Sequence, residues 1–488
     1  MRRKCGVLPT TLELTYCLSG LLERYHITRH TLGFDSVVIV SAQYLSTDRK
    51  QDAPSLTKEI LFPALEKVIH DNTPLAIRVS GVKSSDPIFV RLKSVNLSQV
   101  VRFLDAPASD DIDRVFEEEF INAFDDSDES AQTPLWRLTV TQDNHVIFAW
   151  HHAIGDGLSG IAVHQALLNS LNEPLTSAVN KRSTGESYVA DIDPQATLIP
   201  ALDSLTDLSV SLWTLLFKLI PSVLPPLPIR STEHIWTGNP TPKMPSLVNY
   251  VKTIVLTPQR TKSLHELCKR NGTTLTAFLH ELAIQVLIRL VQPESSTSQK
   301  PKRVTTIPYS IPLTLRRITN MSFTVLCDQT SAYAQRATYS IPDLTSMLVN
   351  PPSPDNFPWE RATNLSKILR TAAPNSREVI GSLKYLSGKY ETFFLSKLGK
   401  KREQGIEVSN LGAFKLEPQS SGSHQARWTI GKTYFAQNDG VQGAAIKVNI
   451  TGDPLGGMSF SITSGKDAVP DGLLDKFKQD LELCLSRF

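Results

Sequence analysis

Cysteine is scarce in this chain of 488 residues, and its five occurrences are scattered. No two of them form a Cys-X-X-Cys pair, whereas zinc sites take three or four Cys and His ligands at recurring spacings, so no bound metal is expected. Scattered cysteines suit free thiols in a reducing compartment, which predicts a cytoplasmic protein. The five residues are Cys5, Cys17, Cys268, Cys327 and Cys484.

The chain also lacks an excess of charge of either sign. Its net charge is +3, and no stripe of interleaved basic and aromatic residues is present, so no nucleic-acid partner is expected. Phosphate loops of the Walker or Gly-X-Gly-X-X-Gly kind are absent, which leaves ATP and dinucleotide chemistry without support. The nearest approach to a serine nucleophile elbow, Gly-Leu-Ser-Gly at residues 157–160, lacks the second glycine at the required spacing.

What the chain does contain is His-His-Ala-Ile-Gly-Asp-Gly at residues 151–157. Residues 136–141 and the apolar run 146–150 precede it as two predicted strands of a hairpin, with Asp143 and Asn144 at the turn. Apolar residues at helical spacing follow it, over 157–172. The motif is therefore expected in a loop between a strand and a helix.

A histidine in such a loop suits general-base chemistry, because imidazole can be neutral near pH 7 and accept a proton. We predict that His152 is the base. Asp156 follows four residues later and could orient the ring as the acid of a triad does.

The motif resembles the HHxxxDG signature of the CoA-dependent acyltransferases that include chloramphenicol acetyltransferase, peptide-synthetase condensation domains and BAHD enzymes. Within that superfamily, the start of the chain resembles the fungal alcohol O-acetyltransferases. The similarity runs nearly end to end, although the plant-type DFGWG element is absent. The other segments that carry it are residues 23–25, 29–34, 37–44, 134–138, 271–279, 312–316 (PLTLR) and 408–412 (VSNLG).

The resemblance implies an α/β fold of two chloramphenicol-acetyltransferase-like halves, each a mixed sheet flanked by helices, with the active site in the channel between them. It also implies that Asp156 points away from the base and pairs with Arg316 as a structural brace. A buried pair of this kind is costly to break from one side.

Other site residues are expected around this pair. His151 is expected to be structural and packed beneath the site, and Gly157 to let the backbone and a thioester approach each other. Ser409 and Asn410 are candidates for holding the oxyanion or contacting CoA. The alternative for these two residues is a turn that merely closes the C-terminal sheet.

The function that the resemblance implies is acyl-CoA-dependent O-acyl transfer. An acetyl group would pass from acetyl-CoA, a co-substrate rather than a permanently bound cofactor, to the hydroxyl of a small hydrophobic alcohol such as a terpenoid or polyketide. Two alternatives stay open: a condensation-type enzyme whose acyl donor is bound to a carrier protein, and a catalytically silent binding protein of the same fold. A chain without an adenylation or carrier domain favours the first function.

The landmarks divide the chain into an N-terminal half (1–185) with the His-His motif, a connector (186–244), and a C-terminal half (245–488) with the PLTLR and VSNLG segments. The protein is expected to be a monomer. Beyond the elements around the motif, strands are predicted at 37–44, 251–256, 304–311, 444–450 and 457–463, and helices at 258–270, 273–291 and 472–486.

The connector holds the one segment that complicates a soluble interpretation. Residues 208–217 are largely apolar, but they are too few to span a bilayer, which needs about 20 apolar residues. They predict either a helix that covers part of the core or acceptor channel, or a patch that associates with a membrane surface. In the second case the protein would be peripheral on endoplasmic reticulum or lipid droplets, as related alcohol acetyltransferases are.

Overall fold

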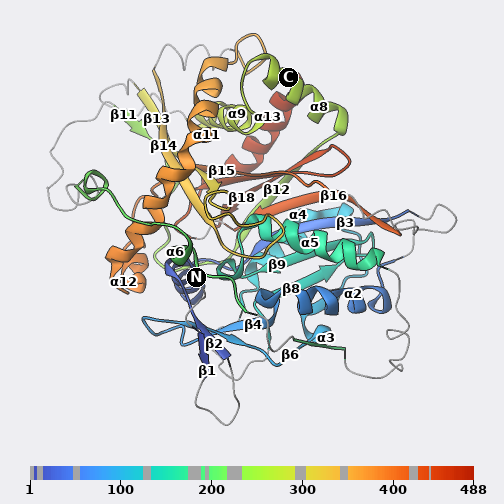
Figure 1. The fold of residues 1–488 in the computed structure, drawn as a ribbon. Helices are drawn as coiled ribbons and strands as arrows, with labels where there is room; N and C mark the ends of the chain where they lie inside the picture. Colours follow the sequence, from blue (N-terminus) through green and yellow to red (C-terminus); the bar gives the residue numbers. More distant parts are fainter. Residues whose placement is uncertain are drawn as a thin grey trace.

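The computed structural model describes residues 5–7, 15–47, 55–124, 133–173, 188–192, 197–216, 233–291, 304–340, 350–416, 427–438 and 441–488. Within them, the chain forms a mixed α/β fold around two large sheets with helices packed against both (Figure 1). In Figure 1 the upper sheet comes mainly from the C-terminal part of the chain and the lower sheet mainly from the N-terminal part.

The lower, five-stranded sheet carries the His-His motif. Its strands run in the order β16 (Trp428–Gln437), β3 (Val38–Ser46), β9 (His145–Trp150), β8 (Trp136–Val140) and β7 (Val101–Phe103). Helices α2 (Lys58–Asp71) and α5 (Gly157–Asn172) pack on one face, and α4 (Ala108–Ile121) packs on the other. Because β9 is buried on both faces, the run before the motif is apolar without alternation.

The hairpin that was predicted before the motif is present. Strands β8 and β9 pair in antiparallel register from Trp136 opposite Trp150 to Val140 opposite Val146. Asn144 lies in the turn with a φ of 59°, a left-handed conformation that asparagine tolerates better than most residues. The local sequence therefore sets the strand that ends at the motif.

The upper, seven-stranded sheet forms the second core. Its order is β11 (Glu233–Ile235), β13 (Val304–Thr314), β15 (Ile406–Ala413), β17 (Ile446–Gly452), β18 (Met458–Gly465) and β12 (Asn249–Leu256), and β14 (Thr330–Ser340) also pairs with β13. Its core includes side chains from four helices, α8 (Pro258–Arg270), α9 (Leu275–Leu290), α11 (Trp359–Gly381) and α13 (Leu473–Arg487).

One strand crosses the predicted boundary between the halves. Strand β16 belongs to the C-terminal half in sequence, but it pairs with β3 at the edge of the N-terminal sheet. The Thr463 hydroxyl of β18 donates to the Gln437 carbonyl at the end of β16, with 2.7 Å between the oxygens. This hydrogen bond links β16 of the lower sheet to β18 of the upper sheet.

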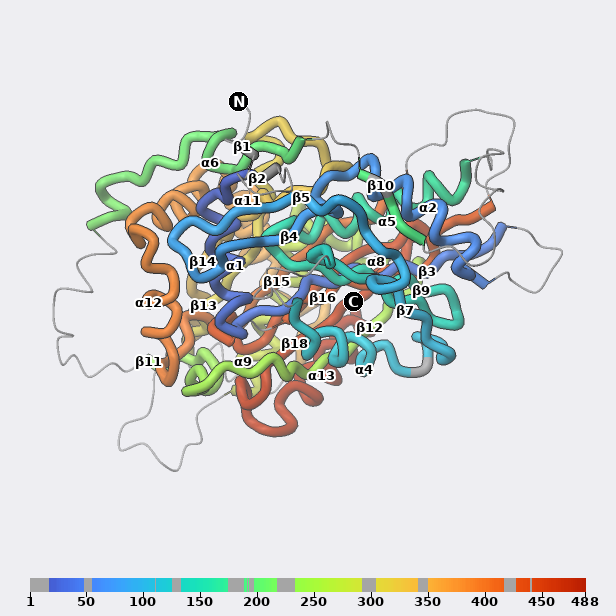
Figure 2. Tube along the Cα trace, turned by 90° about the horizontal axis from the view of Figure 1, so that it is seen from below, coloured from blue at the N-terminus to red at the C-terminus, as the bar shows by residue number. Residues whose placement is uncertain are grey.

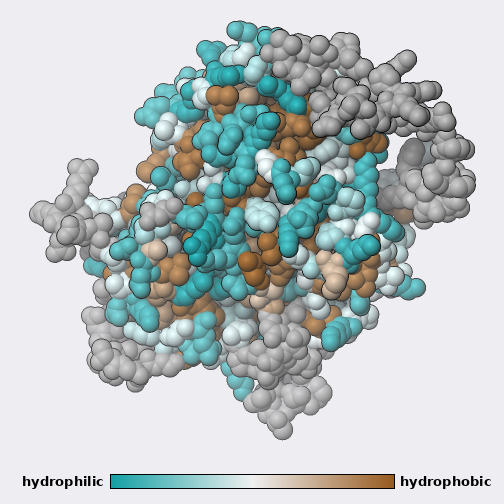
Figure 3. Space-filling view, turned by 180° about the vertical axis from the view of Figure 1, so that it is seen from behind, coloured by the Kyte–Doolittle hydropathy of each residue, from teal (hydrophilic) through white to brown (hydrophobic). Residues whose placement is uncertain are grey.

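The remaining elements lie around these sheets. Figure 2 shows the small strands and α1 gathered at the underside of the molecule. The surface seen in Figure 3 intersperses hydrophilic and hydrophobic side chains, as on ordinary globular proteins. These elements are β1 (Cys5–Val7), β2 (Thr15–Leu18), α1 (Leu21–Thr31), η1 (Thr73–Ala76), β4 (Ile77–Ser80), β5 (Ile88–Arg91), β6 (Ser94–Asn96), α3 (Leu97–Val100), η2 (His152–Ile154), β10 (Val189–Asp191), α6 (Leu202–Leu205), η4 (Ser382–Leu386) and α12 (Tyr390–Leu395).

Each predicted strand and helix is present, with ends displaced by a few residues. The sequence pattern missed α1, α2, α4, α11 and the strands β14, β15 and β16. Helix α11 was missed because Pro374 lies inside it, and an internal proline normally ends a helical pattern. Its buried positions recur at helical spacing on both sides of the proline, so tertiary packing overrides the local preference.

The apolar part of the connector divides between core and surface. Leu208 is buried in a cluster with Leu22, Leu315 and Ile380. The helical turn at 212–216 instead exposes its side chains, with Trp213 at 72%. Residues 217–232 lie outside the described residues, so the membrane-surface patch stays a prediction. Among the described residues, no single helix is long and apolar enough to cross a bilayer, and only α8 and α9 together reach that length, as a pair bent by 98°.

The expectation of free thiols is confirmed for Cys268, Cys327 and Cys484 and is wrong for Cys17, which is disulfide-bonded. Cys5 lies opposite Cys17 in the antiparallel ladder of β1 and β2. Residues that face each other in such a ladder are within reach of a disulfide, and their proximity depends on strand pairing that the spacing in sequence did not reveal.

Candidate active site

The His-His motif is mounted in the loop that the sequence predicted. Strand β9 ends at Trp150, the short helix η2 follows, and α5 begins at Gly157 with Asp156 as its N-cap. The Asp156 carboxylate accepts a hydrogen bond from the Ser159 backbone N–H at 3.1 Å, a usual N-cap interaction. The loop is therefore fixed at both ends by regular structure.

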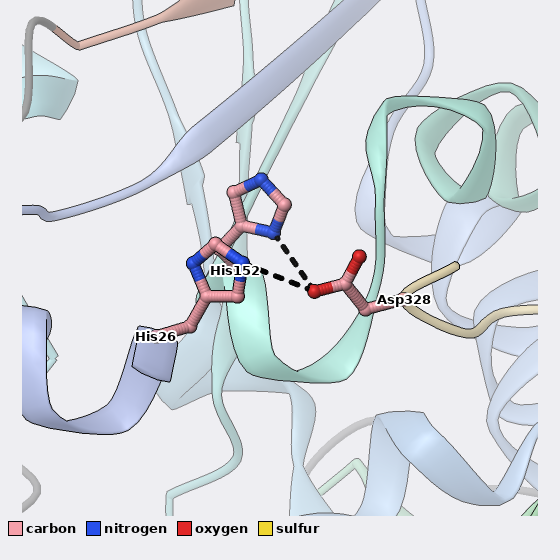
Figure 4. A group of neighbouring side chains, drawn as sticks. All are labelled: His26, His152 and Asp328. Atoms are coloured by element: carbon pink, nitrogen blue, oxygen red, sulfur yellow. Dashed lines mark ion pairs between the residues drawn. The ribbon is translucent and has the colours of Figure 1, made fainter. Parts of the chain in front are cut away.

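His152 stands in a group of three side chains that come from distant parts of the chain (Figure 4). Its Nδ1 lies 3.5 Å from Oδ2 of Asp328, and Nε2 of His26 lies 3.2 Å from the same oxygen. The two imidazole rings stack with their centroids 3.8 Å apart and an interplanar angle of 5°. One carboxylate oxygen is thus shared by two parallel imidazoles.

Electrostatics distinguishes the two histidines. Burial alone would raise the pKa of Asp328, but His152 and His26 hold it well below its usual range, so the carboxylate is charged. Burial, followed by the neighbouring His152, lowers the pKa of His26 to about 4. Burial also works against a charge on His152, yet Asp328 and then Asp35 raise its pKa above the ordinary value. A proton that enters the group is therefore held by His152.

The other ring nitrogen of His152 is available for chemistry. Nε2 makes no hydrogen bond to any residue in the described part of the chain, and the side chain is 17% exposed, toward a cavity of about 380 Å³. Residues of both large sheets and of α1, α5 and α11 line this cavity. A group that binds there reaches the free nitrogen of a base whose opposite edge is oriented by a carboxylate.

The contact expected between Asp156 and Arg316 is present, and it is buried. The Arg316 Nη2 donates to Oδ1 of Asp156 at 2.7 Å, its Nε donates to Oδ2 at 3.2 Å, and the arginine side chain is 0% exposed. Asp156 therefore points away from His152, and the interpretation of Asp156 as the acid of a triad is wrong. That position belongs to Asp328.

The same ion pair holds the segment that carries Asp328. Arg316 donates to the carbonyls of Ser322, Val325 and Cys327 at 2.7–3.1 Å. The Gln329 backbone N–H donates to Asp156 at 3.3 Å, and the Asp156 N–H donates to the Cys327 carbonyl at 3.1 Å. Both neighbours of Asp328 are thus fixed by the brace, which positions the carboxylate against His152.

His151 and Gly157 lie where they were expected. His151 is buried, its Nδ1 accepts the Ala153 backbone N–H at 2.9 Å, and burial lowers its pKa well below the ordinary value. Gly157 lines the cavity, and a Cβ there would lie 2.7 Å from a methyl carbon of Leu411 and 3.2 Å from the ring of Phe435. A larger residue at this position would therefore force Leu411 or Phe435 to shift.

Ser409 and Asn410 also line the cavity, but from strand β15 rather than from a turn. The Asn410 amide is occupied, since it donates to the Thr276 hydroxyl at 3.0 Å and accepts from the Gly412 N–H at 2.8 Å. Among the described residues, the Ser409 hydroxyl meets only the Gln437 amide, which donates to it at 3.5 Å. Ser409 is therefore the more available donor, and the roles of both residues remain predictions.

His26, His152 and Asp328 are also the described residues that could together hold a metal ion, with ligand atoms within 4.8 Å of one another. Lone pairs of ligating imidazoles lie in the ring planes and must converge on the metal. Here the rings are parallel and stacked, so their lone pairs run side by side. This arrangement fits two ion-pair contacts with one carboxylate better than tetrahedral coordination.

Sequence reasoning missed His26 and Asp328. His26 lies beside segment 23–25, which carries the resemblance, but a histidine in a helix has no spacing signal that points to His152. Asp328 was within reach of reasoning, because it lies in the connection after Arg316, the expected partner of Asp156. Asp328 is the single carboxylate between β13 and β14, but only the fold shows that it faces His152.

Two helix-flanked mixed sheets with a His-His motif at the cavity between them, and an aspartate of the same loop braced by an arginine, are typical of the chloramphenicol-acetyltransferase-like class of acyltransferases. The family model for alcohol acetyltransferases matches residues 19–479. The chain therefore belongs to the alcohol acetyltransferase family, and it is an acyltransferase.

Curated relatives agree along nearly the whole chain. It is 24% identical to the probable alcohol acetyltransferase crmB of Aspergillus fumigatus, over 94% of this chain and 97% of the relative. It is also 24% identical to the probable alcohol acetyltransferase FCK4 of Fusarium pseudograminearum, over 96% of this chain and 94% of the relative.

Solved structures confirm the two-lobed fold. The trichothecene 15-O-acetyltransferase of Fusarium sporotrichioides superposes with a TM-score of 0.67 at 13% identity, covering 100% of this chain and 98% of that one. The condensation domain of the monacolin K polyketide synthase superposes with a TM-score of 0.56 at 11% identity, covering 97% of each chain.

Proposed function

We propose that this protein transfers an acetyl group from acetyl-CoA to the hydroxyl of a small hydrophobic alcohol, by general-base catalysis in a ternary complex. The observation that carries the proposal is His152, oriented through Nδ1 by Asp328 while its Nε2 edge borders the cavity. The family and the relatives named as alcohol acetyltransferases support acetyl as the group and an alcohol as the acceptor.

The reaction needs one proton carrier. Nε2 of neutral His152 takes the acceptor hydroxyl proton as that oxygen attacks the thioester carbonyl. The resulting oxyanion is stabilised by nearby donors, among which Ser409 is the candidate that borders the cavity. As the tetrahedral intermediate collapses, the C–S bond breaks and the imidazolium returns the proton to the departing thiolate. Asp328 stabilises the positive charge on His152 between these two transfers.

Direct transfer is favoured over a covalent intermediate. No cysteine neighbours the motif in sequence, but the fold brings Cys327, the residue before Asp328, next to it, since the Asp156 N–H donates to the Cys327 carbonyl. Burial raises the pKa of Cys327 to about 12, so the thiol is protonated and weakly nucleophilic. Its side chain is not among those that line the cavity.

The acceptor is proposed to be a secondary metabolite such as a terpenoid or polyketide alcohol. Apolar side chains make up much of the cavity lining, including Leu22, Ile380 and Phe435. The similarity to a trichothecene O-acetyltransferase and to fungal alcohol acetyltransferases supports the same class. We propose a cytoplasmic monomer, and membrane-surface association through the connector remains the alternative for its location.

A carrier-protein-bound acyl donor is the runner-up, because condensation domains share the fold. The family match favours the free thioester. Release of CoA thiol from acetyl-CoA in the presence of varied alcohols, with the products identified by mass, separates the transferase from this alternative and from a silent binding protein.

His152→Ala tests the assigned base. We expect turnover to fall about 10²- to 10⁴-fold with the protein still folded, as for a lost general base. His70→Ala is the matched control, since His70 is an exposed histidine paired only with Asp71. Near-normal transfer by His152→Ala would refute the mechanism.

A further inference from the structure

The cavity beside His152 is not apolar all round, because the upper sheet turns a polar face toward it. Side chains alternate along β15 and β17: Ile406, Val408 and Ile446 pack into the core under the helices, while Glu407 and Lys447 border the cavity. Strict alternation along a strand places these two charges on one face, and the register puts them directly opposite each other.

The N-terminal part of the chain contributes a second charged pair to the lining of the cavity. Arg29 of α1 lies 3.4 Å from Asp35. Arg29 lowers the pKa of Asp35 most, and His152 and the Lys447 ammonium lower it further. We call Arg29, Asp35, Glu407, Ser409 and Lys447 the polar wall, and all five line the same cavity as His152.

Lys447 is a charged member of this wall with unused hydrogen-bonding capacity. The residue is 8% exposed, and its ammonium lies 3.7 Å from Glu407, near enough to balance its charge but too far for a hydrogen bond. Glu407 also accepts the Ser310 hydroxyl, at 3.0 Å. Across the described chain, no residue accepts a hydrogen bond from the Lys447 ammonium. An ammonium that borders the cavity with three unspent donors can donate to a ligand oxygen there.

The charges of the polar wall also indicate which kind of ligand oxygen Lys447 binds. Two cations face two carboxylates, so the wall is neutral overall, and a carboxylate on the ligand would add an uncompensated buried charge. A neutral acceptor such as a ketone, lactone or hydroxyl oxygen accepts from the ammonium without that cost. The lining of the same cavity also includes the apolar groups Leu22, Phe323, Val379, Ile380 and Leu383.

We infer that Lys447 is a specificity-determining residue that binds a second, neutral oxygen on the acceptor. The substrate class is then an oxygenated hydrophobic alcohol, with its carbon skeleton against the apolar lining, rather than a simple aliphatic alcohol. This inference rests on the proposed function in that it assigns the cavity to the acceptor.

The test compares matched pairs of alcohols that share one carbon skeleton. The probes are monocyclic and bicyclic alcohols, each with its keto derivative. Binding of each is measured by titration calorimetry without acetyl-CoA, and kcat/KM is measured with it. For wild type we expect the best keto-alcohol to be favoured over its parent about 10- to 100-fold, the usual effect of a hydrogen bond to a charged donor.

Lys447→Met keeps the length of the side chain and removes its donors. It should lower kcat/KM for the keto-alcohol about 10- to 100-fold more than for the parent alcohol, and so abolish the preference. Lys447→Met combined with Glu407→Gln should do the same without leaving Glu407 as an unpaired buried charge. Lys252→Met is the control, because Lys252 lies in β12 of the same sheet and pairs with Asp475 at 2.9 Å, away from the cavity.

Three results would overturn the inference: no preference in wild type, an equal loss for both members of a pair in Lys447→Met, or a raised KM for acetyl-CoA alone. If the binding preference depends on Lys447 but no alcohol in the panel releases thiol, the subsite stands and the proposed transferase function fails.

Discussion

Replacing Asp328 by asparagine should separate the two effects of this carboxylate on His152. The substitution keeps the shape of the side chain and removes its charge. Asp328 raises the pKa of His152, so the free base of the variant should persist to lower pH than in wild type. The acidic limb of kcat/KM should therefore move to lower pH, while the rate on the plateau falls because the ring loses its orienting partner.

The magnitude follows from the distance. Unit charges 3.5 Å apart interact by about 5 kcal/mol at an effective dielectric constant of about 20. His26 shares the same oxygen at 3.2 Å, so His152 receives only part of this energy. General-base catalysis usually contributes about 10²- to 10⁴-fold, which corresponds to about 3–5 kcal/mol at 1.36 kcal/mol per tenfold. Both estimates predict a plateau loss of at least about 100-fold.

The assay is thiol release from acetyl-CoA with a saturating alcohol, across pH 5 to 9, for wild type and Asp328→Asn. Asp207→Asn is the control, because Asp207 is a fully solvated carboxylate whose partner is the nearby Ser209. Circular dichroism and the melting temperature establish that the buried substitution is folded. An acidic limb that stays in place, or moves to higher pH, would refute the assignment of Asp328 as the group that raises the pKa of His152.

Four further predictions concern the brace, Gly157, Cys327 and the buried histidines. Asp156→Ala and Arg316→Ala should each lower both activity and melting temperature, and the double variant should be little worse than either; additive losses would mean that the two do not act as a pair. Gly157→Val should lower activity while the protein still folds, because its side chain would meet Leu411, and wild-type rates would contradict the close approach. Cys327→Ser should retain transfer, and acetyl-CoA alone should leave no acetyl group on the protein; a trapped acetylated peptide or ping-pong kinetics would contradict direct transfer. Stability should fall as the pH drops below about 6.5, because buried histidines with lowered folded-state pKa values stay neutral in the native state and take up protons on unfolding; an unchanged denaturation midpoint between pH 7 and pH 5 would contradict this. The histidines concerned are His26, His145 and His164, with pKa values of about 4, and His280, with a pKa of about 3.

The sequence by itself determined the strand, loop and helix that position His152. The apolar run of β9, the turn at Asn144 and the helical spacing of α5 are all local, and they place His152 in a loop whatever the rest of the chain does. The resemblance added the Asp156–Arg316 pair, because it named both partners. The expectation of free thiols is confirmed for three cysteines and is wrong for Cys17, because that outcome depends on how β1 and β2 pair.

Only the tertiary structure decided what surrounds the histidine. Asp328 faces His152 because the buried brace fixes Cys327 and Gln329 on either side of it, and His26 joins the pair because α1 packs against the short helix that carries His152. Lys447 and Glu407 alternate with core residues in a pattern that the sequence displays, but alternation alone does not tell which face of a sheet meets a cavity. Local periodicity sets the direction of each side chain relative to its own strand or helix, whereas the distances between groups on different elements depend on how the two sheets pack.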